Sequence, residues 1–329
     1  MKRLLVLVIV LILIGIGGYG LLQWLKFDYT ASGPTPSPVT TIIAKGSGLQ
    51  QIAKQLSDAG AIRSPWLFVA ELALNGNPQL QAGEYGFPAH ASIASIVDLM
   101  HRGQVLEHKL TIPEGLTIKQ VLSLINQTPE LRGGLLQQPA EGSILPQTYF
   151  YVYDDPRDAL LGRMTVAATQ ALDKLWSERA TDIPLTDKKQ ALILASVVER
   201  ETGVATERPH VAAVFENRLR LHMKLESDPT VIYAVSQGLG VLDRPITRAD
   251  LGINSPYNTY LNDGLPPGPI CNPGRAAIEA VLHPLSSDDL YFVADGSGGH
   301  AFAKTLAQHN KNVEKWRQLE RGQGNGKGE

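Results

Sequence analysis

The chain has 329 residues, of which 43% are hydrophobic and 19% charged, and its formal net charge is −2 at pH 7. The length predicts two or three domains, and the scattered lysines and arginines argue against a nucleic-acid partner. Cys271 is the single cysteine, which excludes an intrachain disulfide framework and metal sites built on cysteine pairs, but does not decide the compartment.

The N-terminus predicts a membrane anchor. An apolar run covers Leu4–Trp24, and about 20 apolar residues cross a bilayer as a helix. Lys2 and Arg3 precede the run, and only Lys26 follows closely, so the positive-inside rule places the N-terminus in the cytoplasm. A cleaved signal peptide is the alternative, but its apolar core is shorter and ends at a small-residue cleavage site. We therefore expect residues 1–25 to remain as a single-pass anchor.

A linker is predicted over residues 26–40. Pro, Ser, Thr and Gly dominate its second half, and such a composition cannot bury a core. Its prolines favour a semi-extended chain, so we expect the linker to hold the folded part of the protein away from the membrane.

A small α+β module is predicted over residues 41–130. Residues 41–56 and 110–125 each show a strand pattern, a glycine turn and an amphipathic helix, which indicates a weak internal repeat rather than a solenoid. Between these two units the pattern predicts a strand at residues 83–87 and a short helix at residues 92–100.

A mostly helical domain with short strands is predicted over residues 131–321. It begins with a Gly/Pro/Gln-rich stretch, and apolar residues then recur at helical spacing in residues 159–179, 190–202 and 207–221. Residues 244–300 are rich in Pro, Gly and Asn, with a strand predicted at 291–294. We expect a disordered tail at residues 322–329, and the fold class of the whole chain is α+β.

An apolar helix ends in two carboxylates, Glu199 and Glu201. Side chains two residues apart on a helix point about 200° apart, so this pair cannot act together on one substrate atom. Glu201 continues an apolar stripe made by Leu194, Val197 and Val198. A carboxyl group at the edge of an apolar face loses hydration, which raises its pKa as a general acid requires. The alternative, a solvated helix end with ion pairs, is favoured by spacing alone, because structural carboxylates outnumber catalytic ones.

A second polar stretch, residues 225–234, begins another helix. We interpret Asp228 as the N-cap and Pro229 as the first helical residue. This helix start would still bring Glu226 and Tyr233 close to a cleft.

Two loop segments contain further candidate binding residues. Tyr257, Asn258 and Tyr260 precede a proline-rich loop, where rings can stack on sugars and amides can bond to sugar hydroxyls. The alternative is a well-packed loop with one buried tyrosine. His300 follows two glycines that could present it to a cleft, although a lone histidine is more often structural.

Several enzyme classes lack their motifs in this chain. No His-Glu-x-x-His pair, Gly-x-Ser-x-Gly elbow or glycine-rich phosphate loop is present, which argues against a zinc peptidase, an α/β-hydrolase and a P-loop enzyme. We expect no metal site and no cofactor.

Taken together, several motifs resemble one known family. The motifs are Ala195–Thr202, Val214–Leu219, Leu225–Tyr233, Tyr257–Tyr260, Gly264–Ile270 and Tyr291–Gly296. In order and spacing they are similar to the endolytic murein transglycosylase family (MltG, or YceG-like), clearly over residues 190–315 and more loosely back to residue 40. Residues 142–149 depart from the family pattern, which has a tryptophan and a Pro-Asp pair there.

The resemblance implies a periplasmic enzyme anchored in the cell inner membrane. It implies that residues 41–130 are LysM-like and that residues 131–321 cleave the bond between N-acetylmuramic acid and N-acetylglucosamine within peptidoglycan strands. The catalytic residue would be the second carboxylate of the Glu-x-Glu-Thr motif, Glu201, acting alone and leaving a 1,6-anhydro end. The family is thought to cut nascent strands, which makes penicillin-binding proteins candidate partners.

The predicted site therefore has one catalytic residue and a set of substrate contacts. The candidate substrate-binding residues are Ser227, Asp228, Tyr257, Asn258, Tyr260 and His300. Two alternatives stay open: a hydrolase that uses Asp228 or Glu226 as a second carboxylate, and a non-enzymatic scaffold that binds peptidoglycan through residues 41–130.

Overall fold

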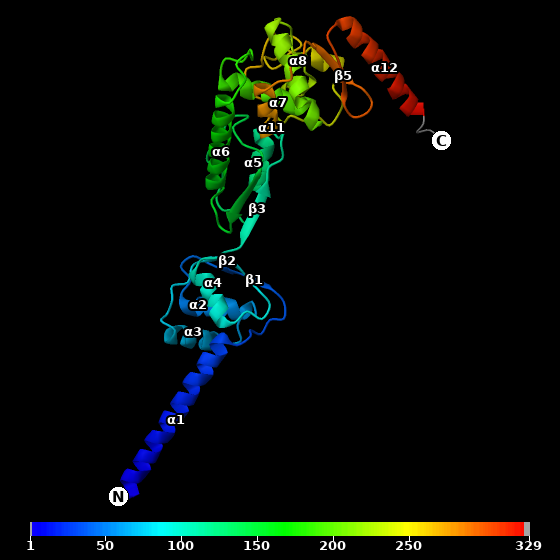
Figure 1. The fold of residues 1–329 in the computed structure, drawn as a ribbon. Coiled ribbons are helices and arrows are strands. Elements are labelled where there is room, and N and C mark those ends of the chain that lie inside the picture. The colour runs from blue at the N-terminus through cyan, green and yellow to red at the C-terminus, as the bar shows by residue number, and fades with distance from the viewer. Residues whose placement is uncertain (1, 326–329) are drawn as a thin grey trace. The chain divides into compact units, whose positions relative to one another are not determined.

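The computed structural model describes residues 2–325, which form two compact units (Figure 1). The first unit contains the chain up to His108 and residues 150–155, and the second contains Lys109–Tyr149 and the chain from Pro156 onward. Both are built from helices and small two-stranded sheets, in agreement with the predicted α+β class.

The boundary between the units differs from the predicted one at residue 130. Residues 109–130 belong to the second unit because their backbone is bonded to its loops: Ile112 N–H donates to the Gln147 carbonyl (3.0 Å), and Asn272 N–H donates to the Leu116 carbonyl (2.8 Å). The local strand–helix pattern did not reveal which core this segment joins.

The first unit begins with helix α1 (Lys2–Thr30), which is long and apolar enough to cross a membrane, with a hydropathy of 2.8. The helix extends through the first residues of the predicted linker. Its C-terminal end packs against the folded part of the unit, because Leu25 is buried there and Asp28 forms an ion pair with Arg63 at 3.2 Å.

The rest of the predicted linker is bound to the first unit. Gly33 N–H donates to the His90 carbonyl (3.1 Å), His90 N–H donates to the Thr35 carbonyl (2.8 Å), and Arg63 donates to the Ser32 carbonyl (3.0 Å). These bonds fix the segment along the unit. The segment is therefore not the free, semi-extended chain that its composition predicts, and its role as a spacer from the membrane stays a prediction.

The remaining elements of the first unit surround one apolar core. Strands β1 (Val39–Ile43) and β2 (Gly83–Phe87) pair antiparallel, with Ile43 opposite Gly83, and helices α2 (Leu49–Asp58), α3 (Pro65–Leu74) and α4 (Ile93–His101) complete the unit. The predicted strand at 83–87 and helix at 92–100 are confirmed. The fully buried side chains of this core include those of Leu56, Phe68, Leu72, Tyr85, Ile96 and Met100.

The predicted internal repeat is confirmed at the level of its elements. In the first copy, β1 leads through Gly46 (φ 82°) into α2; in the second, β3 (Glu107–Thr111) leads through Gly115 (φ 76°) into α5 (Ile118–Asn126). Both glycines have the left-handed backbone that most side chains avoid. Strand β3 pairs with β4 (Thr148–Val152).

The second unit contains most of the helices. They are α6 (Arg157–Ser177), α7 (Lys188–Glu201), η1 (Ala205–Glu207), α8 (Arg208–Arg220), α9 (Asp228–Val235), α10 (Arg248–Leu251), α11 (Arg275–Leu282) and α12 (Leu306–Asn325). Strands β5 (Tyr291–Ala294) and β6 (His300–Ala303) pair antiparallel. The predicted helices and the strand at 291–294 are confirmed. Helix α12 extends beyond the predicted start of the disordered tail, and residues 326–329 lie outside the described part.

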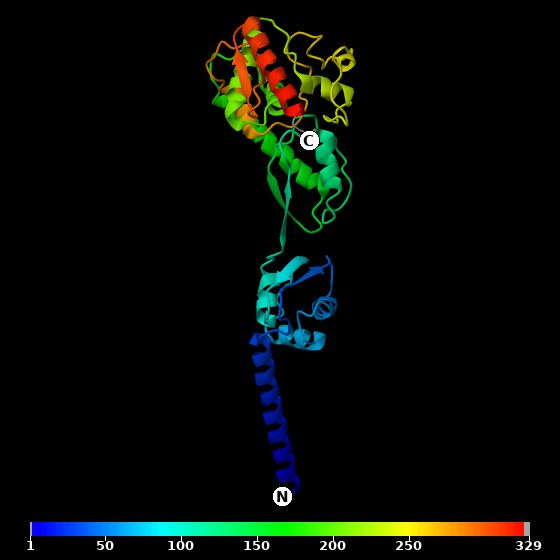
Figure 2. The same cartoon turned by 90° about the vertical axis from the view of Figure 1, so that its right-hand side faces the viewer.

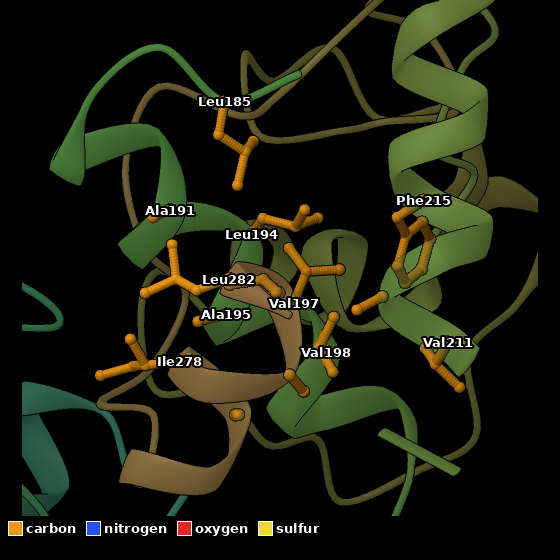
Figure 3. Close-up of a cluster of buried hydrophobic side chains, with 14 of the residues drawn as sticks. Leu185, Ala191, Leu194, Ala195, Val197, Val198, Val211, Phe215, Ile278 and Leu282 are labelled. Carbon is orange, nitrogen blue, oxygen red and sulfur yellow. The ribbon is translucent and has the colours of Figure 1, made fainter. Parts of the chain in front are cut away.

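Helix α7 forms the centre of the second core. Its N-cap Asp187 accepts a hydrogen bond from Gln190 N–H (2.8 Å), and every residue from Ile193 to Val198 is buried. Figure 3 shows side chains from α7, α8 and α11 packed around one another, among them those of Leu194, Phe215 and Leu282. Because each large apolar side chain buried here contributes about 1.5–3 kcal/mol, the end of α7 is held on a rigid base.

Candidate functional site

Glu201 is the last residue of α7, where the helix leaves the apolar core. The next residue, Thr202, is extended (φ −134°, ψ 131°), which ends the helix and leaves the Glu201 side chain at the wall of a cavity of about 330 Å³. This cavity, hereafter the Glu201 cavity, is lined by Glu201, Phe215, Arg218, Leu225, Glu226, Asp228, Tyr260, Phe292 and His309.

Ser227 donates a hydrogen bond from its hydroxyl to Oε1 of Glu201. The position of Ser227 is fixed from two sides: its N–H donates to Oγ1 of Thr259 (3.0 Å), and Oγ1 of Thr230 donates to its carbonyl (2.7 Å). The start of α9 and the loop that contains Thr259 thus position the hydroxyl against the carboxyl group.

The predicted capping role of Asp228 is wrong. Ser227 is the N-cap residue of α9, and its side chain makes no capping bond because the hydroxyl is used by Glu201. Asp228 is instead the first helical residue, followed by Pro229. The helix therefore starts one residue earlier than predicted.

The environment of Glu201 favours its protonated form. Burial raises the pKa of this carboxyl to about 7, the negative charge of Asp228 acts in the same direction, and the hydrogen bond from Ser227 and the charge of Arg218 oppose it. This agrees with the direction expected from the apolar stripe of α7. A carboxyl with a pKa near 7 can both give and take a proton at neutral pH.

Arg218 provides a fixed positive charge at the Glu201 cavity. Its guanidinium donates to the carbonyls of Leu290 (2.7 Å) and Leu225 (3.1 Å) and forms an ion pair with Glu226 (3.0 Å). Glu226 itself has φ 52°, a left-handed conformation that is uncommon for its residue type. These bonds leave the arginine little freedom to move.

Tyr260 and Asp228 form a second polar pair on the wall of the cavity. The tyrosine hydroxyl donates to Oδ1 of Asp228 at 2.6 Å. Burial, followed by this hydrogen bond, raises the pKa of Tyr260 far above its usual value, so the phenol stays neutral. Four of the predicted site residues, Glu201, Ser227, Asp228 and Tyr260, thus lie together.

Ser227 is buried behind Glu201 and does not itself line the Glu201 cavity, and the other three predicted site residues do not line it either. Asn258 is fully buried, and its amide donates to the carbonyls of Leu251 and Ile253, both at 2.9 Å. Tyr257 packs against Tyr233, with ring centroids 4.9 Å apart. His300 is paired through Nδ1 with Oε2 of Glu207 at 2.7 Å. The structure places all three in the scaffold around the cavity, in line with the alternative of a well-packed loop for residues 257 and 258.

Glu199 has a different task from Glu201. Its Oε2 accepts a hydrogen bond from Gly274 N–H (2.8 Å) at the start of α11, and its Oε1 lies 3.7 Å from the guanidinium of Arg208. As expected from their spacing, the two carboxylates of the Glu-x-Glu pair point in different directions and contact different parts of the fold. Glu199 joins α7 to α11, and Glu201 faces the cavity.

The cavity residues that the sequence analysis missed include Arg218, Phe292 and His309. His309 comes from α12, more than a hundred positions after Glu201, and stacks on Tyr291 with centroids 5.2 Å apart. Its Nδ1 is buried without a hydrogen-bond partner, and burial and the charge of Arg218 lower the pKa of the ring. A lone histidine on a polar helix gives no local signal of such a position.

Comparisons with known proteins agree on the family to which the chain is similar. The sequence model of the YceG-like family matches residues 41–315. The chain is 31% identical to a protein of Bacillus subtilis (strain 168) named endolytic murein transglycosylase, over 83% of each chain. A protein of Streptococcus pneumoniae (strain D39) with the same name is 28% identical over 84% of this chain, which spans 58% of that protein's length.

A solved structure shows the same relationship. The crystal structure of a putative YceG-like protein from Listeria monocytogenes superposes with a TM-score of 0.51 at 31% identity, covering 84% of this chain and 98% of the other.

Proposed function

The chain belongs to the YceG-like family, and on this premise we propose that it is a peptidoglycan lytic transglycosylase. As a lyase, it would cleave bonds between N-acetylmuramic acid and N-acetylglucosamine within glycan strands and leave 1,6-anhydro ends. The observation that carries this proposal is Glu201: a carboxyl group with a pKa of about 7 at the wall of a cavity, with the hydroxyl of Ser227 as its partner.

One carboxyl group is sufficient for this reaction. Protonated Glu201 donates its proton to the glycosidic oxygen, and the bond from that oxygen to C1 of the muramic acid breaks. The C6 hydroxyl of the same sugar then attacks C1, and Glu201 takes the hydroxyl proton, which returns the carboxyl group to its starting state. Because the attacking hydroxyl belongs to the substrate, proximity replaces the activation of a water molecule.

The partners of Glu201 fit both halves of this cycle. Burial keeps the carboxyl protonated for the first proton transfer, and the Ser227 hydroxyl stabilises the carboxylate that remains afterwards. The positive charge of Arg218 supports the same ionised state. Glu201 is therefore suited to act first as an acid and then as a base.

The wall of the cavity offers contacts for a sugar. We propose that Asp228 and Tyr260 touch the substrate directly, with the rings of Tyr260 and Phe292 available for stacking on pyranose faces. Ser227, which is buried, would act through its hydrogen bond to Glu201. Tyr257, Asn258 and His300 would act through the loops that they hold in place.

We propose further that α1 anchors the protein in the inner membrane, with the N-terminus in the cytoplasm and the rest of both units in the periplasm. The length and apolar composition of α1 and the preceding Lys2 and Arg3 support this orientation. The first unit would bind glycan as a LysM-like module. At this location the enzyme would meet nascent strands, so penicillin-binding proteins are its candidate partners.

The test is mass spectrometry of products from purified peptidoglycan incubated with the full-length chain in detergent. The wild type is compared with Glu201→Gln and with the matched control Glu216→Gln, which changes a buried glutamate on α8 that does not line the cavity. We expect anhydro-muramic ends from the wild type and the control, and none from Glu201→Gln. Activity that rises steeply with pH well above neutrality would contradict a general acid with a raised pKa.

A hydrolase is the second candidate, because Glu226 and Asp228 line the same cavity and either could activate water. The products of the same experiment separate the two reactions, since hydrolysis gives reducing ends. Binding of glycan by all proteins without any cleavage would favour the non-enzymatic scaffold.

A further inference from the structure

Helix α3 is apolar on its outward face as well as on its inward face. In its sequence, Pro65–Leu74, the exposed side chains are all apolar: Trp66 is 64% exposed, Leu74 is 51% exposed, and Ala73 is exposed as well. On the inner side, Leu67, Phe68 and Leu72 are buried in the core of the first unit together with Glu71. A helix on a water-facing surface normally shows charged residues outward and apolar residues inward.

The single ionisable residue of α3 points inward. Glu71 is fully buried, and neither of its carboxyl oxygens has a hydrogen-bond partner. Burial, together with the nearby charge of Asp28, raises the pKa of Glu71 to about 7. The outward face of α3 therefore has no charge of its own to favour contact with water.

The position of α3 relative to α1 suggests what covers this face. The apolar run of α1 ends at Trp24, and Asp28, four residues later, is paired with Arg63 at 3.2 Å. Four residues of helix rise about 6 Å, and the polar headgroup layer on each side of a bilayer is roughly 5–8 Å thick. Arg63, which immediately precedes the N-cap of α3, thus lies at the level of the headgroups when α1 spans the membrane.

Two views of the first unit agree with this placement. In Figure 1 and Figure 2, α3 lies beside the last turns of α1. Tryptophan is enriched at this depth in membrane proteins, because its ring is apolar and its N–H can bond to headgroups. Apolar side chains of a helix that lies in the plane of the interface enter the boundary between headgroups and acyl chains.

We propose that the outward face of α3, formed by Trp66, Ala73 and Leu74, is a membrane-docking surface that lies in the interface of the leaflet from which α1 emerges. The proposal rests on the anchoring of α1 proposed above. With α1 and α3 both in contact with lipid, the first unit is attached at two places and cannot rotate freely about the end of the anchor.

The test uses the full-length chain in nanodiscs of phosphatidylethanolamine and phosphatidylglycerol. Of the four tryptophans of the chain, three are replaced by phenylalanine, leaving Trp66 alone. Matched chains keep only Trp24 in the anchor or only Trp316 in α12. Fluorescence is recorded with ordinary lipids and with lipids brominated on their acyl chains, which quench only tryptophans in contact with them.

We expect Trp66 to emit at a shorter wavelength than a tryptophan exposed to water and to lose most of its emission in brominated lipids. Trp316 should keep its emission in brominated lipids. Quenching of Trp66 no stronger than that of Trp316 overturns the proposal. So does a blue-shifted Trp66 that is not quenched, since a protein surface or a second copy would then cover it.

The Trp24 chain separates this proposal from its premise. Strong quenching of Trp24 without quenching of Trp66 means that α1 is inserted and α3 is not docked. Absence of quenching at Trp24 overturns the anchor and the docking together. Neither result affects the peptidoglycan assay with Glu201→Gln, so failure of the proposed reaction remains distinguishable.

Discussion

Glu201 and Glu216 lie on neighbouring helices and both have a raised pKa, but their surroundings suit different roles. Burial raises the pKa of Glu201 on α7 to about 7 and that of Glu216 on α8 to about 8. Glu201 lines a cavity and receives the hydroxyl of Ser227, whereas Glu216 is fully buried, with one oxygen unpaired and the other 3.4 Å from Arg220.

The comparison teaches that a raised pKa alone does not identify a general acid. Desolvation raises the pKa of any buried carboxyl, whether or not a substrate can reach it. What distinguishes Glu201 is access to a cavity and a partner that stabilises its ionised form. The predictions below test these differences in order of decreasing effect.

The largest expected effect is the loss of activity in Glu201→Gln. An amide cannot transfer the proton, and a general acid–base group contributes about 10²–10⁴-fold to the rate. Release of anhydro-muramic ends over time measures the loss. Glu216→Gln should keep nearly the wild-type rate. A folded Glu216→Gln protein as inactive as Glu201→Gln would remove the distinction between the two residues.

The second effect concerns stability and its dependence on pH. Because the pKa of Glu216 is raised in the folded state, to about 8 from an ordinary value of 4.5, the folded protein holds a proton that the unfolded chain releases. The contribution of Glu216 is therefore most favourable below about pH 4.5 and is lost as the pH rises towards 8, at a cost on the order of a few kcal/mol.

Glu216→Gln should remove this dependence. The unfolding free energy of Glu216→Gln minus that of the wild type should increase between about pH 5 and 8 and then stay constant. Urea denaturation at several pH values measures this difference. The difference between the two proteins cancels the titration of other groups. A constant difference across this range would show that Glu216 has an ordinary pKa.

A third effect tests the partner of Glu201. The Ser227 hydroxyl lowers the pKa of Glu201, so Ser227→Ala should raise it and move the fall of activity with pH to higher values. A hydrogen bond to a charged group contributes about 1.5–3 kcal/mol, which predicts at least a roughly tenfold loss of kcat at neutral pH. Ser227→Thr keeps a hydroxyl and should restore part of the rate. A Ser227→Ala profile that moves to lower pH would contradict the assignment.

The position of Glu201 at the edge of the core was predictable because its signal is local, whereas its proposed catalytic role came from the family resemblance. The stripe of Leu194, Val197 and Val198 extends to Glu201 within two turns of one helix, and burial of this stripe places the carboxyl at the edge of the core. The strand–glycine–helix units were predictable for the same reason, since periodicity and turn residues act over short distances.

Features that depend on tertiary contacts were not predictable. The composition of the loop around Asn258 suits sugar binding, but the fold turns its amide inward to satisfy two backbone carbonyls. The boundary at His108 depends on which core residues 109–130 join, and the docking of the linker depends on His90 and Arg63, which lie far along the chain. Arg218 and His309 reach the cavity in the same way, from separate helices.

His309 provides the smallest expected effect and tests this long-range contribution. The imidazole ring lines the cavity and its lowered pKa keeps it neutral, so we expect the ring to form a hydrogen bond to bound glycan. A neutral hydrogen bond of about 0.5–1.5 kcal/mol predicts a roughly two- to tenfold rise in KM for His309→Ala, with kcat nearly unchanged.

His309→Phe separates the nitrogen from the ring. It retains stacking on Tyr291 but has no ring nitrogen, and we therefore expect its KM to stay as high as that of His309→Ala. If the phenylalanine variant instead recovers the wild-type KM, the contribution of α12 is packing against β5, and the polar contacts of the Glu201 cavity come from α7, α8 and α9 and the Tyr260 loop alone.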